Sequence, residues 1–104
     1  MEMKEIYGKA ISELAQKLTV SGIPFEVISL HDGYGICYPN QKDWKGDAVC
    51  HSGSYGHQRG LLEAMGFGIN RKDNGDDVVG YLTVAEAYEY FAEQYRKDTV
   101  NANA

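Results

Sequence analysis

The chain has 104 residues, 43% of them hydrophobic and 24% charged, with a formal net charge of −5. This length predicts a single globular domain with one core, and the acidity argues against nucleic acid as a partner. Two cysteines are too few for a secreted disulfide framework. The sequence shows neither a signal peptide nor an apolar run long enough for a membrane helix, so we expect a cytoplasmic protein that does not enter membranes.

Residues 3–20 carry the pattern of an amphipathic helix. Its apolar side chains recur at helical spacing: Tyr7, Ile11, Leu14 and Leu18. Gly22 is suited to the left-handed residue that ends a helix, and Pro24 cannot continue one. The helix is therefore predicted to stop near Ser21.

Three short β-strands are predicted to follow, at residues 25–30, 34–39 and 47–52. The first two are separated by His31-Asp32-Gly33, in which the Asp-Gly pair suits a tight hairpin turn. In the second strand the larger side chains alternate with smaller ones and are expected on the buried face: Tyr34, Ile36 and Tyr38.

A second helix is predicted over residues 55–65. Ser54 is suited to its N-cap, and Gly66 to the residue just beyond its C-terminus. Leu61, Leu62 and Met65 would then share one face.

The C-terminal part contains a third helical pattern. Residues 78–82 are interpreted as a short strand or an extended arm. Thr83 and Glu86 form a capping box, which predicts that a helix begins there and continues to about Lys97. Residues 100–104 have nothing to bury and are expected to form a disordered tail.

Together these elements predict an α+β fold in the order α-β-β-β-α-(β)-α. A single domain spans residues 1–99 and consists of an antiparallel meander of three strands, or four, with about three helices on one face. The short connections between the strands require antiparallel neighbours.

Polar side chains near residues 47–63 suggest one enzymatic hypothesis. Histidines and carboxylates are the usual general acids and bases, so a small hydrolase or nuclease could use four residues there: His51, His57, Asp47 and Glu63. No recognised motif supports that chemistry. The spacing of Cys37 and Cys50 relative to the histidines also matches no zinc motif, so we expect no metal and no cofactor.

Aromatic residues outside the core patterns suggest a binding hypothesis. With a neighbouring histidine they would form a surface for a protein partner: Trp44, Tyr55, His57, Tyr81 and Tyr90. The alternative is that these rings only cover the ends of loops. The sequence is also compatible with a homodimer.

Several short motifs resemble a group of small uncharacterised proteins encoded by phages and prophages of Gram-positive gut bacteria. The most specific are Ser54-Tyr55-Gly56-His57, the Leu61–Gly66 stretch and Gly80-Tyr81-Leu82-Thr83, and the resemblance runs from about Ile11 to Phe91. It carries no established activity. It implies an accessory protein that binds a host or phage macromolecule, so a non-catalytic binding protein is the main prediction and a small hydrolase or nuclease the alternative.

Overall fold

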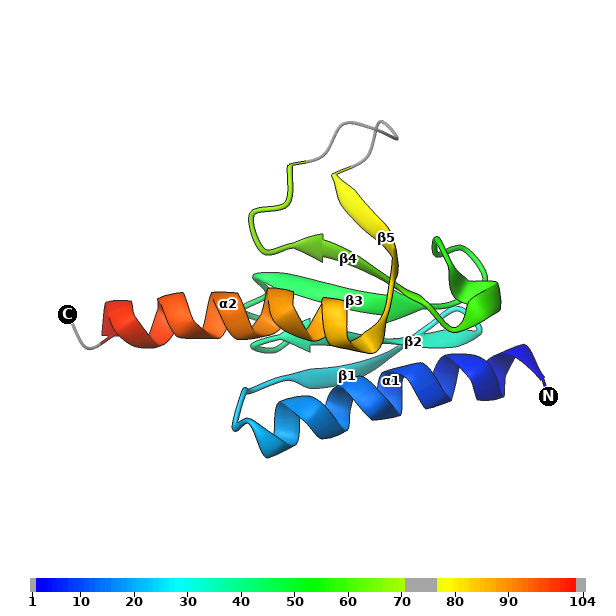
Figure 1. Cartoon of the computed structure of the whole chain (residues 1–104), viewed down its shortest axis with the longest axis horizontal. Coiled ribbons are helices and arrows are strands. Elements are labelled where there is room, and N and C mark those ends of the chain that lie inside the picture. The colour runs from blue at the N-terminus through cyan, green and yellow to red at the C-terminus, as the bar shows by residue number, and fades with distance from the viewer. Residues whose placement is uncertain (1, 71–76, 103–104) are drawn as a thin grey trace.

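The structure is a computed structural model that describes residues 2–70 and 77–102. It is an α+β fold with two helices and a five-stranded antiparallel sheet in the order β1-β2-β3-β4-β5 (Figure 1). The elements are α1 (Met3–Val20), β1 (Glu26–Leu30), β2 (Gly33–Tyr38), β3 (Gly46–Cys50), the short 3₁₀ helix η1 (His57–Arg59), β4 (Leu62–Gly66), β5 (Val78–Leu82) and α2 (Val84–Ala102). The predicted α+β class is confirmed, whereas the predicted numbers of strands and helices are wrong.

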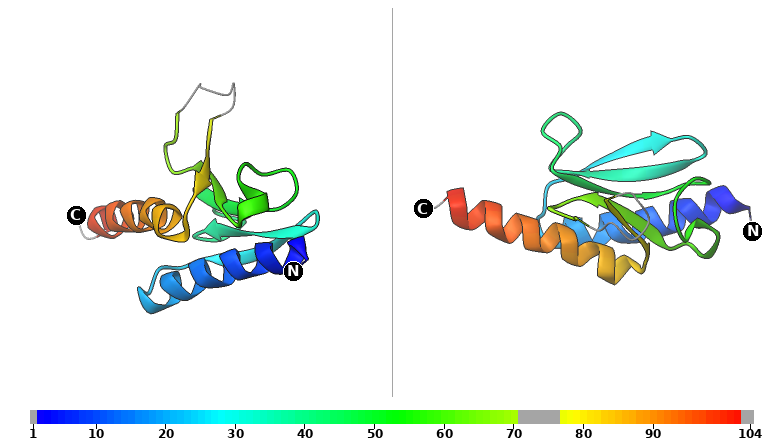
Figure 2. Two further views of the ribbon diagram at one scale, coloured as in Figure 1. Left: turned by 45° about the vertical axis from the view of Figure 1, so that its right-hand side comes forward. Right: turned by 90° about the horizontal axis from the view of Figure 1, so that it is seen from above.

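Both helices pack against the same face of the sheet, and Figure 2 shows them together on that side. Because side chains alternate along a strand, every second residue of β2, β3 and β4 faces the helices. These inward side chains are almost fully buried: Ile36, Tyr38, Ala48, Cys50, Leu62 and Ala64. Among the described residues no helix covers the opposite face, which we call the outer face.

Helix α1 confirms its sequence pattern. Its buried side chains are Tyr7, Ala10, Ile11, Leu14 and Leu18. The helix ends as predicted, because Gly22 has a φ of 71° and its N–H donates to the carbonyl of Thr19. The N–H of Ile23 donates to the carbonyl of Leu18, which completes the cap.

Helix α2 begins with the predicted capping box. The Thr83 N–H donates to Glu86 Oε1 at 2.9 Å, and the Glu86 N–H donates to Thr83 Oγ1 at 3.1 Å. The helix continues to Ala102 and therefore includes residues 100–102, which the sequence had assigned to a tail. Residues 103 and 104 lie outside the described part of the chain.

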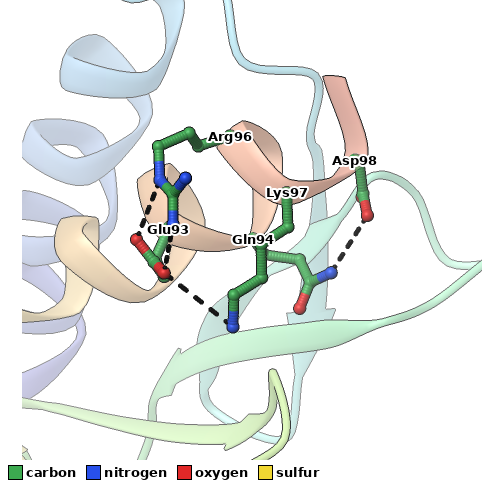
Figure 3. A network of polar contacts seen from close by, with 5 residues as sticks. All are labelled: Glu93, Gln94, Arg96, Lys97 and Asp98. Carbon is green, nitrogen blue, oxygen red and sulfur yellow. Dashed lines mark hydrogen bonds and ion pairs between the residues drawn. The ribbon is translucent and has the colours of Figure 1, made fainter. Parts of the chain in front are cut away.

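Asp98 joins the C-terminal half of α2 to the sheet. Its carboxylate accepts hydrogen bonds from the buried Tyr38 hydroxyl at 2.7 Å and from Gln94 Nε2 at 3.0 Å, and it pairs with Lys45 at 2.9 Å. Partial burial alone would raise the pKa of Asp98, but these donors lower it below its usual range. Figure 3 shows the helix side of this network, in which Glu93 separately binds Arg96 and Lys97.

The helix predicted over residues 55–65 is wrong. Gly56 and Gly60 have φ angles of 91° and 67°, in the left-handed region that a right-handed helix cannot contain. Leu62 and Ala64 are buried, whereas Glu63 is half-buried and Met65 is exposed, which is the two-residue period of a strand. Residues 62–66 are β4, and residues 57–59 form only the short 3₁₀ helix η1. In β4, pairing with both β3 and β5 outweighs the local helix preference of its residues.

Two local expectations fail with that helix. Ser54 is not an N-cap, and Gly66 is the last residue of β4 instead of a helix terminator. A Cβ on Gly66 would lie 2.5 Å from Gly46 Cα, so glycine is needed there for the close approach of β3 and β4.

Candidate functional site

The loop between β3 and β4, residues 51–61, is organised by the buried hydroxyl of Ser54. This side chain is only 3% exposed. Its Oγ accepts a hydrogen bond from the His51 N–H at 3.0 Å and donates one to the His51 carbonyl at 2.9 Å. The Ser54 N–H also donates to that carbonyl, at 2.9 Å. The loop thus has a fixed first turn, which positions the residues that follow it.

His51 lies at the base of this loop beside the β1–β2 turn. Its ring is 4.9 Å from the ring of His31, and its Nδ1 accepts a hydrogen bond from the Gly53 N–H. Burial lowers the pKa of His51, and the neighbouring His31 lowers it further, so the imidazole is neutral at pH 7. Asp32 holds the same corner, because its carboxylate accepts a hydrogen bond from the Ser52 N–H at 3.0 Å. His51 therefore fixes the loop through an acceptor nitrogen.

Tyr7 of helix α1 fixes the position of the His57 ring. The Tyr7 hydroxyl lies 2.7 Å from His57 Nδ1, and the two rings meet edge to face at 5.6 Å. Burial raises the pKa of Tyr7, as does the charge of Asp32, so the phenol stays protonated and can donate to the imidazole. Within the described chain, His57 Nε2 makes no hydrogen bond. This nitrogen remains able to bind a ligand.

A cleft of about 310 Å³ opens beside His57. It is lined by residues 52–59 and by Tyr81 of β5. Tyr55 and Tyr81 stack on each other at its rim, with ring centres 6.3 Å apart and an angle of 23° between the rings. Their exposed fractions are 37% and 62%. A polar cleft is thus bordered by two large rings at the surface.

The backbone of β5 is strained where it presents Tyr81. Between two neighbouring pairings, Leu62 with Leu82 and Ala64 with Val79, two steps along β4 match three along β5. The extra residue is a β-bulge, and Tyr81 within it has a φ of 58°. A non-glycine residue in this region costs on the order of 1 kcal/mol or more. The Tyr81 N–H donates to the Tyr55 carbonyl at 3.3 Å, which ties the bulge to the loop.

The structure brings together only part of the predicted binding surface. Tyr55, His57 and Tyr81 line one cleft. Trp44 instead donates from Nε1 to Asp47 at 2.9 Å, and Tyr90 packs against Phe67 next to the core.

The residues of the hydrolase hypothesis are also divided. Asp47 is paired with Met65, and Glu63 with Val49, so both carboxylates lie on the outer face of the sheet. His51 and His57 lie at the loop, where the nearby carboxylate is Asp32. The sequence had placed Asp32 only in a turn.

Tyr7 is the residue that sequence reasoning missed at this site. Its spacing in the helical stripe correctly predicted a core position, which explains the ring but not its hydroxyl. Fifty residues separate it from His57, and no local signal in the sequence predicts that pairing.

The two cysteines lie on opposite faces of the sheet. Cys37 pairs with Asp47 and faces outward, whereas Cys50 pairs with Tyr34 and faces the helices. Both thiols are free, and burial raises the pKa of Cys50 to about 11. In the described ranges, no group of three or more histidine, cysteine and acidic side chains could hold a metal ion.

Comparisons with protein families, with curated proteins and with solved structures find no match to this chain. The resemblance to phage and prophage proteins therefore stays a prediction from the sequence. No helix among residues 2–70 and 77–102 is long and apolar enough to cross a membrane. A functional proposal therefore depends on the geometry of the loop at residues 51–61 and of the cleft beside it.

Proposed function

We propose that this chain is a non-catalytic binding protein whose contact surface is the Tyr55–Tyr81 pair and the cleft beside it. The observation that carries the proposal is the stack of two exposed tyrosines, in which Tyr81 of the strained bulge packs against Tyr55 of the loop. The partner is proposed to be a protein, because tyrosine supplies large contact area at low conformational entropy and is enriched at protein interfaces.

The surroundings of the pair favour binding. Gln58 and Arg59 line the same cleft and supply polar groups around the rings, as the rim of an interface does. The ring stack, together with the hydrogen bond from the Tyr81 N–H to the Tyr55 carbonyl, holds both rings in place before a partner binds. This reduces the conformational entropy lost on binding. A net charge of −5 disfavours nucleic acid as that partner.

The biological setting is proposed from the sequence alone. The motif resemblance supports a phage-borne accessory protein that acts in the bacterial cytoplasm on a host or phage protein. The Tyr55–Tyr81 surface contains two of the motifs on which the resemblance depends, Ser54–His57 and Gly80–Thr83.

The test is an affinity capture with matched variants. One bait is Tyr55→Ser with Tyr81→Asn, because asparagine tolerates the left-handed backbone at position 81. The control bait is Val20→Ser with Val100→Ser, which also removes two exposed apolar side chains. We expect the wild type and the control to enrich the same protein and the tyrosine variant to lose it. Enrichment that is equal for all three baits would refute the proposed surface.

A small hydrolase remains the second candidate, since Tyr7 holds His57 beside the cleft with Nε2 unbonded in the described chain. The direct assay screens the full chain against esters and nucleic acids, with and without added divalent metal. We expect no turnover, and we expect His57→Gln to cost at most about 1–2 kcal/mol of stability. Turnover by the wild type that disappears in a stably folded His57→Gln variant would establish the enzyme instead.

A further inference from the structure

The two edges of the sheet differ in how they are protected against pairing with another strand. Natural proteins block edge strands with bulges, prolines, inward-pointing charges or covering loops. The β5 edge has such a bulge at Tyr81, and the Tyr81 N–H donates a hydrogen bond to the Tyr55 carbonyl in the loop between β3 and β4. The β1 edge has the sequence EVISL and pairs with β2 in unbroken register, with neither a bulge nor a proline. Its one charged residue, Glu26, accepts a hydrogen bond from the Gln41 N–H.

The free backbone groups of β1 are on the side where a new strand would add. Leu30 and Gly33 close a two-residue turn, and a closing pair of this kind is hydrogen-bonded across the hairpin. Alternation along the strand then directs the N–H and C=O groups of Val27 and Ser29 away from β2. Both residues are exposed, and Val27 retains 48% of its accessible surface.

An apolar groove of about 350 Å³ runs beside this edge, between helix α1 and the first two strands. Its lining residues are Gly8, Ile11, Ser12, Ala15, Val27 and Tyr34. None of them is acidic or basic, although the whole chain carries a net charge of −5. Three of the four helix residues in the lining are small, namely Gly8, Ser12 and Ala15, and they leave room under β1. Residues of an added strand that lie opposite Val27 would direct their side chains to the same face, into the groove.

We propose that β1 is a docking edge for an extended segment of another protein, which adds as a sixth strand and inserts an apolar side chain into this groove. The occupant is a foreign segment instead of a second copy for two reasons. A stable dimer needs about 800 Å² from each partner, whereas the β1 edge is only five residues long. Two copies would each bring a net charge of −5, whereas a segment with basic flanks complements it.

This surface is independent of the proposed tyrosine surface, because β1 and β5 are the opposite edges of the sheet. The probe is a displayed library of random linear peptides, selected on the immobilised full chain. Val27→Lys places a charge at the groove and on the edge, and Val100→Lys is its matched control at a similarly exposed valine of α2. A Tyr55→Ser, Tyr81→Asn variant separates the two surfaces.

We expect selected peptides to carry apolar residues at alternating positions and basic residues near their ends. Val27→Lys should weaken their binding by about tenfold or more, since a lysine there must be desolvated against an apolar side chain. Val100→Lys and the tyrosine variant should bind as the wild type does. Bound peptide should also slow amide hydrogen exchange at Val27 and Ser29, which a distant site would not do.

Three results would overturn the proposal. One is a selection on the wild type that enriches no more than a parallel selection on the Val27→Lys variant. Another is a set of peptides that bind the wild type and Val27→Lys equally. The third is a wild-type dimer in sedimentation analysis that Val27→Lys dissociates, because the occupant of the edge would then be a second copy.

Discussion

Gly80→Ala tests the contact between β5 and the loop on which the tyrosine surface depends. A Cβ added at Gly80 would lie 2.3 Å from Tyr55 Cβ and 3.2 Å from its Cγ. Both Cβ atoms are attached directly to the backbone, so no rotamer change can relieve the overlap. Either the loop or the strand must move, and overpacking of this kind costs about 1–3 kcal/mol.

A double-mutant cycle separates this overlap from other effects. Tyr55→Gly removes the opposing Cβ, so Gly80→Ala in that background should cost almost nothing. The coupling between the two changes should therefore be about 1–3 kcal/mol. Gly8→Ala is the control within α1: its new Cβ would meet Tyr34 Cε2 at an ordinary 3.5 Å, and we expect about 1 kcal/mol of stabilisation.

Urea unfolding followed by circular dichroism and by Trp44 fluorescence measures all four variants, because the chain has a single tryptophan. We also expect Gly80→Ala to weaken the affinity for a captured partner, because the substitution separates the stacked rings of Tyr55 and Tyr81. If Gly80→Ala costs the same with Tyr55 present or absent, the loop does not pack against β5 as described. The structural basis of the tyrosine surface would then be wrong.

Other predictions concern the core, a cap and the thiols. Ile36→Asp should abolish cooperative thermal unfolding, because it buries an unpaired charge at a position with no exposed surface; a normal transition would contradict the register of β2. Thr83→Ala should cost about 1 kcal/mol in urea unfolding. The hydrogen bonds from Thr83 lower the pKa of Glu86. The wild type should therefore be more stable than Glu86→Gln at pH values above the pKa of the carboxyl group in the unfolded chain. This difference in the free energy of unfolding should disappear as the pH falls through the lower pKa of the folded state. Burial raises the pKa of Cys37 and Cys50, so a thiol reagent at pH 8 should modify them only after unfolding, and rapid reaction of the folded protein would contradict their burial.

Local patterns predicted both helices and the first three strands because each of these elements is specified by residues that are close together in the sequence. The stripe of α1 and its Gly22 cap, and the Thr83–Glu86 box of α2, depend only on residues three or four positions apart. Tyr34, Ile36 and Tyr38 likewise share a face because of strand alternation alone.

The segment Leu62–Gly66 and the candidate site were decided by tertiary structure. Leu-Glu-Ala-Met favours a helix, and five residues are too few to separate a helical period from a strand period. Hydrogen bonding to β3 and β5 supplies partners for the backbone on both sides, and this gain outweighs the local preference. The Tyr7–His57 bond joins residues 50 positions apart. Such contacts exist only once the sheet and α1 have assembled. The sequence by itself therefore determined both long helices and the first three strands, and the tertiary structure decided β4 and which polar groups meet.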